Sequence, residues 1–262
     1  MNADKQLIVI SDLDGTLLDH YSYQFEAAQP ALALLADNHI PLVLNSSKTA
    51  AEILEIRKAL NNHQPFIAEN GGGIYLPEAD GYRSVAIGRP RTEFLPELYD
   101  LRDRLKLSFV GFRDMSSQQL MEHTGLTEHA CRLAKQRDYT EPLLWKDSVE
   151  ALQKFTDALQ QQGLQVLRGG RFVHVSGQTD KGAAVRWLKR YFQEQMNRRI
   201  EIAALGDSDN DLAMLAEADY PFLIRSPVHP PPDIQLPNLK ISDQFGPAGW
   251  NECICQFLES HT

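Results

Sequence analysis

The sequence predicts an α/β fold whose parallel sheet is built from two separated parts of the chain. Short apolar runs alternate with helical patterns over residues 7–68, and this rhythm is typical of a parallel sheet with right-handed crossovers. The same rhythm returns after Gly177. Between the two parts, short strands and helices are mixed without such alternation, which indicates an inserted α+β module.

Each predicted strand is a short apolar run, and each predicted helix has apolar residues spaced three and four apart. In the first part, strands are predicted at 7–11, 41–44 and 66–68, and helices at 30–37 and 49–60. The differently patterned middle opens with two short strands at 74–76 and 85–87. In the insert, helices are predicted at 93–104, 116–121, 128–135 and 148–162, strands at 108–112 and 143–145, and a hairpin of 165–167 and 172–175 across Gly169 and Gly170. In the last part, strands at 202–205, 222–224 and 239–241 alternate with helices at 180–195, 211–218 and 248–259.

This alternation divides the chain into two domains. We expect a discontinuous α/β core of residues 1–83 and 176–262, with an inserted domain of residues 84–175, a size that small domains commonly have. Glycines at the junctions, Gly88 and Gly177, predict a hinge.

Composition narrows the function further. The 262 residues are 43% hydrophobic and 23% charged, close to globular averages, which excludes a disordered chain, a collagen and a coiled coil. The net charge of −9 argues against a nucleic acid partner, because duplex binding needs a basic face. Apolar runs fall far short of the roughly 20 residues of a membrane span. The start of the chain has no apolar signal core, and three cysteines without metal spacing suggest reduced thiols, so we expect a cytoplasmic protein. The sequence carries no signal for an oligomeric state.

Asp12 and Asp14 lie directly after the first predicted strand, where open α/β sheets bind ligands. Two carboxylates followed by Gly15 can hold a hard cation such as Mg²⁺, and a carboxylate can also attack phosphorus. The alternative is an ordinary Asp-Gly turn.

A second acidic segment follows the predicted strand 202–205. Asp207, Asp209 and Asp211 repel one another unless a positive charge lies among them, so they indicate a cation site. The alternative is a helix cap, which explains one or two of these acids but not three.

Two weaker segments complete the set. Ser46 and Ser47 follow the strand 41–44 and open a helix, which suits anion binding but also ordinary capping. Lys181 heads another helix and can neutralise phosphate, although a lone lysine is usually a surface group. Carboxylates, hydroxyls and a lysine at one sheet edge favour phosphoryl transfer.

In their order along the chain, these four segments resemble the four motifs of the haloacid dehalogenase superfamily of phosphatases. The resemblance covers the whole chain and implies a Rossmann-like core with an α+β cap of the second cap class. Within that class, the chain resembles the mannosyl-3-phosphoglycerate phosphatases. The supporting segments are Ser46-Ser47-Lys48-Thr49, Ala68-Glu69-Asn70-Gly71-Gly72, Thr124-Gly125-Leu126, Thr140-Glu141-Pro142 and Gly169-Gly170-Arg171-Phe172.

The resemblance implies a role for each motif residue. Asp12 would attack phosphorus and become an aspartyl phosphate, while Asp14 would act first as a general acid and then as a general base. Mg²⁺ would be held by Asp12, the backbone carbonyl of Asp14 and Asp207, with Asp211 orienting this shell. Ser46, Ser47 and Lys181 would bind the phosphoryl oxygens.

Substrate choice is expected to lie in the insert and in the glycine run that begins at Glu69. A glycine run permits close approach of the backbone to a ligand, so Glu69, Asn70 and Gly71 are candidate substrate contacts. A phosphoglycerate glycoside also carries a carboxylate, which needs a cation. The candidates are Lys48, Arg137, Arg168 and Arg171, each with an ordinary solvated side chain as the alternative.

Three functions stay open at this point. The first is a Mg²⁺-dependent phosphatase acting on mannosyl-3-phosphoglycerate or its glucosyl analogue. The second is the same chemistry on another sugar phosphate, such as sucrose 6-phosphate or a hexose phosphate. The third is a non-enzymatic phospho-acceptor module, against which Asp14, Lys181 and the large insert argue.

Overall fold

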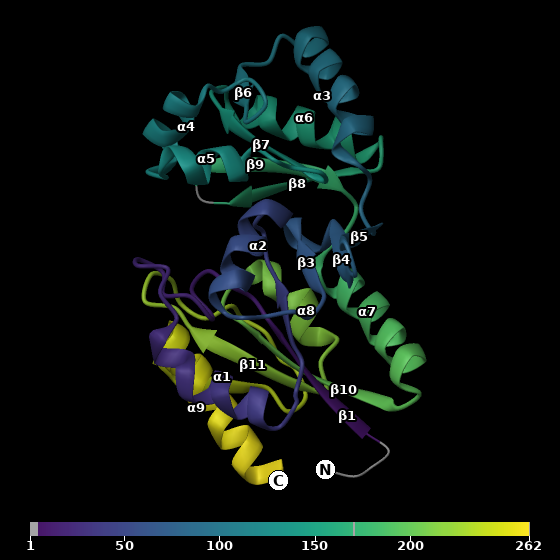
Figure 1. Ribbon diagram of the computed structural model, residues 1–262. Coiled ribbons are helices and arrows are strands. Elements are labelled where there is room, and N and C mark those ends of the chain that lie inside the picture. The colour runs from purple at the N-terminus through teal and green to yellow at the C-terminus, as the bar shows by residue number, and fades with distance from the viewer. Residues whose placement is uncertain (1–4, 170, 262) are drawn as a thin grey trace.

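The computed structural model describes residues 5–169 and 171–261, and these form two sheets stacked one above the other (Figure 1). The larger sheet has the strand order β12-β11-β10-β1-β2-β3-β4-β5, and the smaller has the order β6-β7-β9-β8. We call residues 5–86 and 178–261 the large-sheet unit and residues 91–177 the small-sheet unit. Among the described residues, no helix combines the length and the apolar character that a membrane span needs.

The large sheet is parallel except at one edge. Its parallel strands are β1 (Lys5–Ser11), β2 (Leu42–Asn45), β3 (Phe66–Ala68), β10 (Arg199–Gly206), β11 (Tyr220–Arg225) and β12 (Lys240–Phe245). The antiparallel strands β4 (Gly73–Glu78) and β5 (Gly81–Ala86) extend the sheet past β3. The middle strands β1 and β2 carry the continuous apolar runs of residues 7–10 and 42–44 because helices cover both faces, as expected for a parallel sheet.

Helices bury each face of the large sheet in its own apolar core. On one face lie α1 (Gln29–Asp37), α2 (Ala50–Ala59) and α9 (Gly246–His261), which contribute Leu35, Ile53 and Trp250 to that core. On the other lie α7 (Lys181–Met196) and α8 (Leu212–Ala216), which contribute Leu188 and Leu215. Short 3-10 turns, η1 (Glu26–Ala28), η2 (Glu69–Gly71) and η3 (Asp209–Asp211), complete the unit.

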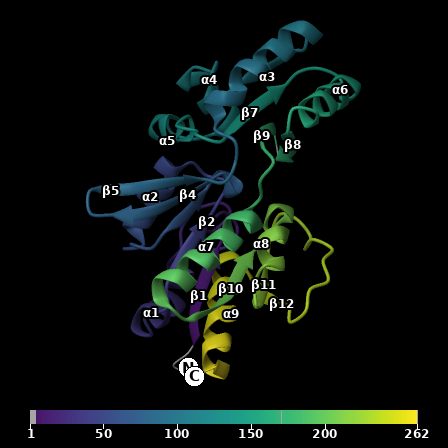
Figure 2. The ribbon, with the colours of Figure 1, turned by 90° about the vertical axis from the view of Figure 1, so that its right-hand side faces the viewer.

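The small sheet is antiparallel and has helices on both of its faces. It consists of β6 (Phe109–Gly111), β7 (Thr140–Trp145), β8 (Leu164–Gly169) and β9 (Phe172–Gly177). The helices α3 (Arg91–Leu105) and α6 (Val149–Gln160) bury one face with Leu164 and Val166 of β8, while α4 (Ser117–Thr124) and α5 (Glu128–Ala134) bury part of the other. The small sheet lies between α6 and the large-sheet unit (Figures 1 and 2).

The structure confirms the predicted α/β fold, and each predicted helix and strand is present with shifted ends. Strand β7 begins at Thr140 and not at residue 143, and the added residues include Glu141, whose buried carboxylate is paired with Arg91 at 2.5 Å. The pattern of apolar residues gives no sign of such a pair. Gly170, half of the predicted hairpin turn, lies outside the described residues.

The segments that connect the large-sheet unit to the small-sheet unit lie side by side. Strand β5 runs to Ala86, beyond the predicted boundary at 83, and β9 runs to Gly177. A Cβ atom on Gly177 would lie 2.6 Å from the backbone nitrogen of Arg89, so the two connecting segments are in contact. Gly177 is therefore needed for close packing of the connections, and the hinge stays a prediction.

Candidate active site

Four segments that are distant in the sequence converge at the carboxyl edge of the large sheet. The side chains of Asp12, Asp207 and Asp211 are buried, and one oxygen of each lies within 4.8 Å of the others. We call these three residues the acidic cluster. The cluster brings together the two acidic segments that the sequence singled out.

The acidic cluster fits a hard divalent cation. It places three buried carboxylates around one buried ammonium, that of Lys181, so negative charge is in excess. Gly15 has φ +80, and a Cβ atom there would lie 2.6 Å from Asp207 Oδ2. Any larger residue at position 15 would therefore displace this carboxylate. Oxygen donors of this kind are the ligands that Mg²⁺ prefers.

Lys181 connects two members of the cluster. Its Nζ lies 2.5 Å from Asp12 Oδ1 and 2.6 Å from Asp211 Oδ1, and its side chain is fully buried. Burial alone would lower the pKa of Lys181, but the two carboxylates outweigh it and raise the pKa, so the ammonium stays charged. The alternative considered from the sequence, that Lys181 is an ordinary solvent-exposed lysine, is therefore wrong.

Asp12 is the carboxylate with the most perturbed proton affinity. Burial raises the pKa of Asp12 to about 8; Lys181 opposes this shift, and the neighbouring carboxylates of Asp211, Asp207 and Asp14 add to it. An added positive charge beside Asp12 would favour its ionised form, which is the form that can act as a nucleophile.

Asp211 and Asp207 differ in their partners. Asp211 Oδ2 accepts hydrogen bonds from the backbone nitrogens of Asp207 and Ser208, at 3.0 and 3.1 Å, while its other oxygen faces Lys181. Asp211 thus fixes the loop that carries Asp207. Burial raises the pKa of Asp207, whose Oδ2 lies 3.2 Å from His229 Nε2.

His229 is a neighbour of the cluster that sequence reasoning missed. It lies on the loop between β11 and β12, among Pro227 and the run Pro230–Pro232, a stretch that reads only as a rigid surface loop. Its contact with Asp207 joins residues 22 apart in sequence, and no local pattern signals it.

Asp14 points away from the cluster toward another cation. Its Oδ2 lies 2.9 Å from Lys48 Nζ, and its Oδ1 is buried without a hydrogen-bond partner among the described residues. Burial would lower the pKa of Lys48, but Asp14 outweighs it and the pKa is raised. Lys48 Nζ also lies 5.1 Å from the ring centroid of Tyr23, which has a left-handed backbone, φ 57.

Asp14, Lys48 and Tyr23 line a cavity of about 270 Å³ between the two units. The large-sheet unit also contributes Ser47 and Glu52, and the small-sheet unit contributes Phe112, His123, Thr124, Leu126, Ala134, Arg137, Arg171 and Phe172. We call this space the interunit cavity. It adjoins the cluster through Asp14 and is the candidate substrate site.

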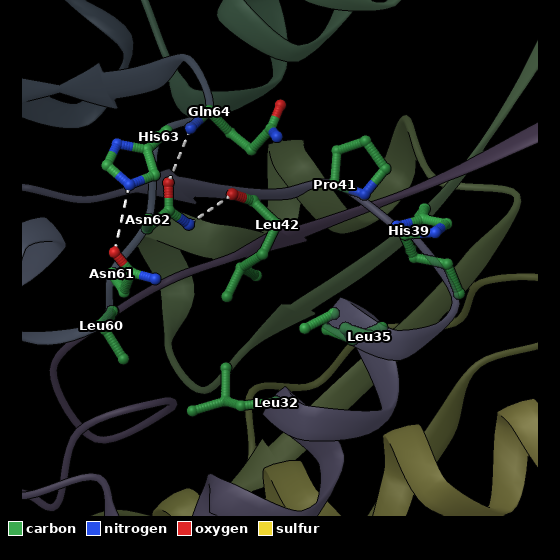
Figure 3. A pocket seen from close by; sticks show the side chains of 12 residues that line it. Leu32, Leu35, His39, Pro41, Leu42, Leu60, Asn61, Asn62, His63 and Gln64 are labelled. Carbon is green, nitrogen blue, oxygen red and sulfur yellow. Dashed lines mark hydrogen bonds between the residues drawn. The ribbon is translucent and has the colours of Figure 1, made fainter.

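A second cavity, of about 330 Å³, lies at the opposite edge of the large sheet (Figure 3). Three of its polar side chains bond to the chain: Asn62 donates to the carbonyl of Leu42 and accepts from the nitrogen of Gln64, and His63 bonds to Asn61. Leu32 and Leu35 form much of its wall (Figure 3). None of the acidic-cluster residues lines this cavity, so it is not a candidate active site.

The serines and arginines predicted as ligands are placed differently from one another. Ser46 is buried beside the cluster edge, where its Oγ accepts from the backbone nitrogen of Lys48 at 3.2 Å, and Ser47 lines the interunit cavity. Arg137 and Arg171 reach the cavity from the small-sheet unit. Arg168 is exposed and alternates with Val166 and Leu164, so it shares the face that α3 and α6 cover and not the cavity face.

The glycine run also differs from expectation. Both oxygens of Glu69 accept hydrogen bonds from residues 138–140 of the small-sheet unit, and the side chain has no exposure. A Cβ atom on Gly71 would collide with the carbonyl of Asp180, so this glycine admits another part of the chain and not a ligand. Asn70 Oδ1 accepts from Asn210 Nδ2 at 3.0 Å, beside the cluster.

Comparison with known proteins identifies the class. Residues 9–226 match the family described as haloacid dehalogenase-like hydrolase, and the chain belongs to that family. The chain is similar to the glucosyl-3-phosphoglycerate/mannosyl-3-phosphoglycerate phosphatase of Methanococcoides burtonii, with 37% identity covering 96% of this chain and 97% of the relative. It is 34% identical to the protein of the same name from Persephonella marina, again over 96% and 97%. These matches confirm the predicted resemblance.

Solved structures agree on the fold. A Thermoplasma acidophilum protein aligns with a TM-score of 0.67 at 16% identity, covering 97% of this chain and 98% of that one. The sucrose-phosphatase of Synechocystis, solved with sucrose and phosphate, aligns with a TM-score of 0.59 at 16% identity, over 97% and 98%. Likeness at this identity concerns the fold alone.

Proposed function

We propose that the protein is a Mg²⁺-dependent phosphatase that hydrolyses glucosyl-3-phosphoglycerate or mannosyl-3-phosphoglycerate, releasing phosphate and the glycosylglycerate. The observation that carries the proposal is the position of Asp12, a buried carboxylate at the end of β1 that contacts Lys181 and adjoins Asp207 and Asp211. The names of the two relatives, similar to this chain along almost its whole length, support the substrate.

In the first step, one oxygen of Asp12 attacks phosphorus and forms an aspartyl phosphate as the bond to the glycerate oxygen breaks. Asp14 gives its proton to that oxygen. Lys181, Ser46 and Ser47 bind the phosphoryl oxygens and hold them in place. Asp12, the backbone carbonyl of Asp14 and Asp207 would hold Mg²⁺, with Asp211 orienting them. When bound, the ion would supply positive charge against the phosphoryl and carboxylate oxygens.

In the second step, Asp14 takes a proton from water, and the resulting hydroxide attacks the phosphorus of the aspartyl phosphate. The bond to Asp12 breaks, which releases phosphate and restores the carboxylate. Lys48 Nζ, 2.9 Å from Asp14 Oδ2, holds this carboxyl group in place beside the interunit cavity.

We further propose that the small-sheet unit acts as a cap over the interunit cavity, in a domain division near the predicted boundaries. Its support is a set of contacts between α2 and α5, which include a hydrogen bond of 3.1 Å from Thr49 Oγ1 to the carbonyl of Leu133. Cys131, Cys253 and Cys255 are all unpaired, which fits a cytoplasmic location.

The test is phosphate release with Mg²⁺ from both phosphoglycerate glycosides, sucrose 6-phosphate, hexose phosphates and phosphoglycolate, each repeated with EDTA. A strong preference for the glycosides that EDTA abolishes is the expected result. Activity spread over simple sugar phosphates would retain the chemistry and reject this substrate. Absence of release from every compound would reject the enzyme and favour a phospho-acceptor.

A further inference from the structure

We propose that Arg137 binds the carboxylate of the substrate and that Glu69 is the positioning residue that holds Arg137 in place. The inference rests on the proposed function and narrows its substrate class to phosphomonoesters whose alcohol carries a carboxylate near the phosphate. It also distinguishes Arg137 from Lys48, Arg168 and Arg171, the other three cations that the sequence analysis gives as candidates for binding this carboxylate.

Arg137 is a buried cation with a free donor. Its side chain is 8% exposed and lines the interunit cavity together with Asp14 and Lys48. One terminal nitrogen donates to Thr140 Oγ1 at 2.6 Å. The Nε atom is buried and has no hydrogen-bond partner among the described residues. A donor left unpaired beside a cavity favours a ligand that accepts there.

The charge of Arg137 is also incompletely balanced. Within the described part of the chain, Glu69 is the one carboxylate within 4 Å of its nitrogens, at 3.8 Å. That carboxylate already accepts three backbone hydrogen bonds and one from the Thr140 hydroxyl. A buried cation without a dedicated anion is costly, and the planar guanidinium matches a carboxylate.

Glu69 holds this arrangement from the other unit. It follows β3 in the large-sheet unit, yet its carboxylate accepts from the backbone nitrogens of Asp138 and Thr140, at 2.7 and 2.8 Å. A chain of hydrogen bonds runs from Arg137 through Thr140 Oγ1 to Glu69 Oε2, the last bond being 2.5 Å. Glu69 has φ 53, a left-handed backbone conformation that is unfavourable for a non-glycine residue. Strain of this kind persists where surrounding contacts enforce it.

The other three cations have different surroundings. Lys48 is paired with Asp14. Arg171 is exposed and donates to the carbonyl of His123 at 2.6 Å. Arg168 lies on the face of the small sheet away from the cavity. Arg137 therefore combines burial, a fixed position and a spare donor.

The experiment compares Arg137→Lys with the matched control Arg171→Lys, since both arginines line the cavity. Each is assayed with glucosyl-3-phosphoglycerate and with its neutral methylamide, in which only the carboxylate is changed. We expect Arg137→Lys to lower kcat/KM for the acid by roughly 10- to 100-fold, mainly through KM, as for a lost charged hydrogen bond, and to leave the amide nearly unchanged. Arg171→Lys should leave the acid-to-amide ratio close to that of the wild type.

Glu69 is tested through the same ratio. Glu69 does not contact the substrate in this proposal, but Glu69→Gln should still lower the ratio of kcat/KM for the acid to kcat/KM for the amide. Thr140→Val, which removes the hydroxyl between Glu69 and Arg137, should lower this ratio to a smaller degree. A cooperative thermal melt is required of each variant as evidence that it is folded. If Glu69→Gln does not fold, Thr140→Val provides the test instead. An equal loss on both substrates in Arg137→Lys, or a selective loss in Arg171→Lys, would overturn the proposal.

A binding arm separates this proposal from the proposed function. Calorimetry measures binding of the acid and the amide to Asp12→Asn and to Asp12→Asn with Arg137→Lys. Suppose that the wild type releases no phosphate, but that Asp12→Asn binds the acid more tightly than the amide and loses this preference when Arg137→Lys is added. That result would reject the phosphatase and retain the carboxylate site. Equal binding of acid and amide to Asp12→Asn would reject the carboxylate site alone.

Discussion

The Nζ of Lys181 lies 2.6 Å from Asp211 Oδ1, and neither side chain has any exposure to solvent. The same ammonium contacts Asp12, so one positive charge is shared between the proposed nucleophile and the residue that shapes the loop of Asp207. The two ends of the acidic cluster are therefore held together through a single side chain.

Removing this charge should destabilise the protein. We expect Lys181→Met to lower the free energy of unfolding by about 3–5 kcal/mol without metal, because it leaves buried carboxylates unpaired. Added Mg²⁺ should restore part of the loss. Urea unfolding with and without Mg²⁺ measures both effects. The control is Lys189→Met, whose partly exposed ion pair with Asp219 should contribute no more than about 1 kcal/mol. Equal losses in the two variants would contradict the role given to Lys181.

Replacing the proposed nucleophile should separate activity from folding. Asp12→Asn keeps the shape of the side chain but removes its nucleophilic oxygen, so phosphate release should fall on the order of 10⁴-fold or more, with a thermal melt still cooperative. The control is Asp209→Asn, an exposed residue in the same loop as Asp207, which should stay close to wild-type activity. Turnover retained in Asp12→Asn would exclude Asp12 as the nucleophile.

Gly15 should matter for metal binding beyond its backbone conformation. Gly15→Ala places a methyl group against Asp207 Oδ2, so we expect the Mg²⁺ affinity to fall by about 10- to 100-fold, as for other displaced metal ligands. Gly125→Ala has nearly the same φ, +77, with open space around it. It should lose about 1–2 kcal/mol of stability through its backbone and keep its Mg²⁺ affinity. Calorimetric titration of Mg²⁺ distinguishes the two, and matching affinities would refute the steric argument.

His174 should make stability depend on pH. Burial, together with the charge of Arg137, lowers the pKa of His174 from 6.5 to about 4. Between these values the unfolded chain binds a proton that the folded chain does not, so this contribution to stability is present above pH 6.5 and lost as the pH falls to 4. The shift corresponds to about 3 kcal/mol. His174→Gln should flatten the pH dependence of urea unfolding over this range, whereas the exposed His63→Gln should not. Parallel curves for wild type and His174→Gln would show that His174 has no part in it.

The residues of the acidic cluster were predictable because parallel strands end at one edge of a sheet. Asp12 and Asp207 each follow an apolar run, and such runs are the strand pattern that a single sequence reveals best. Ser46 comes to the same edge for the same reason, whereas Lys181 is there because it begins α7, the helix that leads from this edge back to the start of β10. The rule fixes where a segment ends but does not say where each side chain points.

Side-chain direction explains the rest. Arg168 was predicted as a substrate contact, but the alternation of β8 turns it to the helix-covered face, and only the register with β9 decides that face. Glu69 is polar and near the motifs, yet its partners lie about 70 residues further along the chain. His229 and Tyr23 reach the site from loops whose sequences carry no apolar period.

The turn that holds Glu69 joins two partners across one peptide bond. Glu69 bonds to the small-sheet unit, whereas the next residue, Asn70, bonds to Asn210 beside Asp211, and both residues have left-handed backbones. Separation of the small-sheet unit from Glu69 would have to break these hydrogen bonds or turn this peptide, to which the contact of Asn70 with Asn210 is also attached. The spacing between the small-sheet unit and the loop that carries Asp207 is therefore set at this point by a single peptide bond, so a residue inserted between Glu69 and Asn70 would lengthen that link.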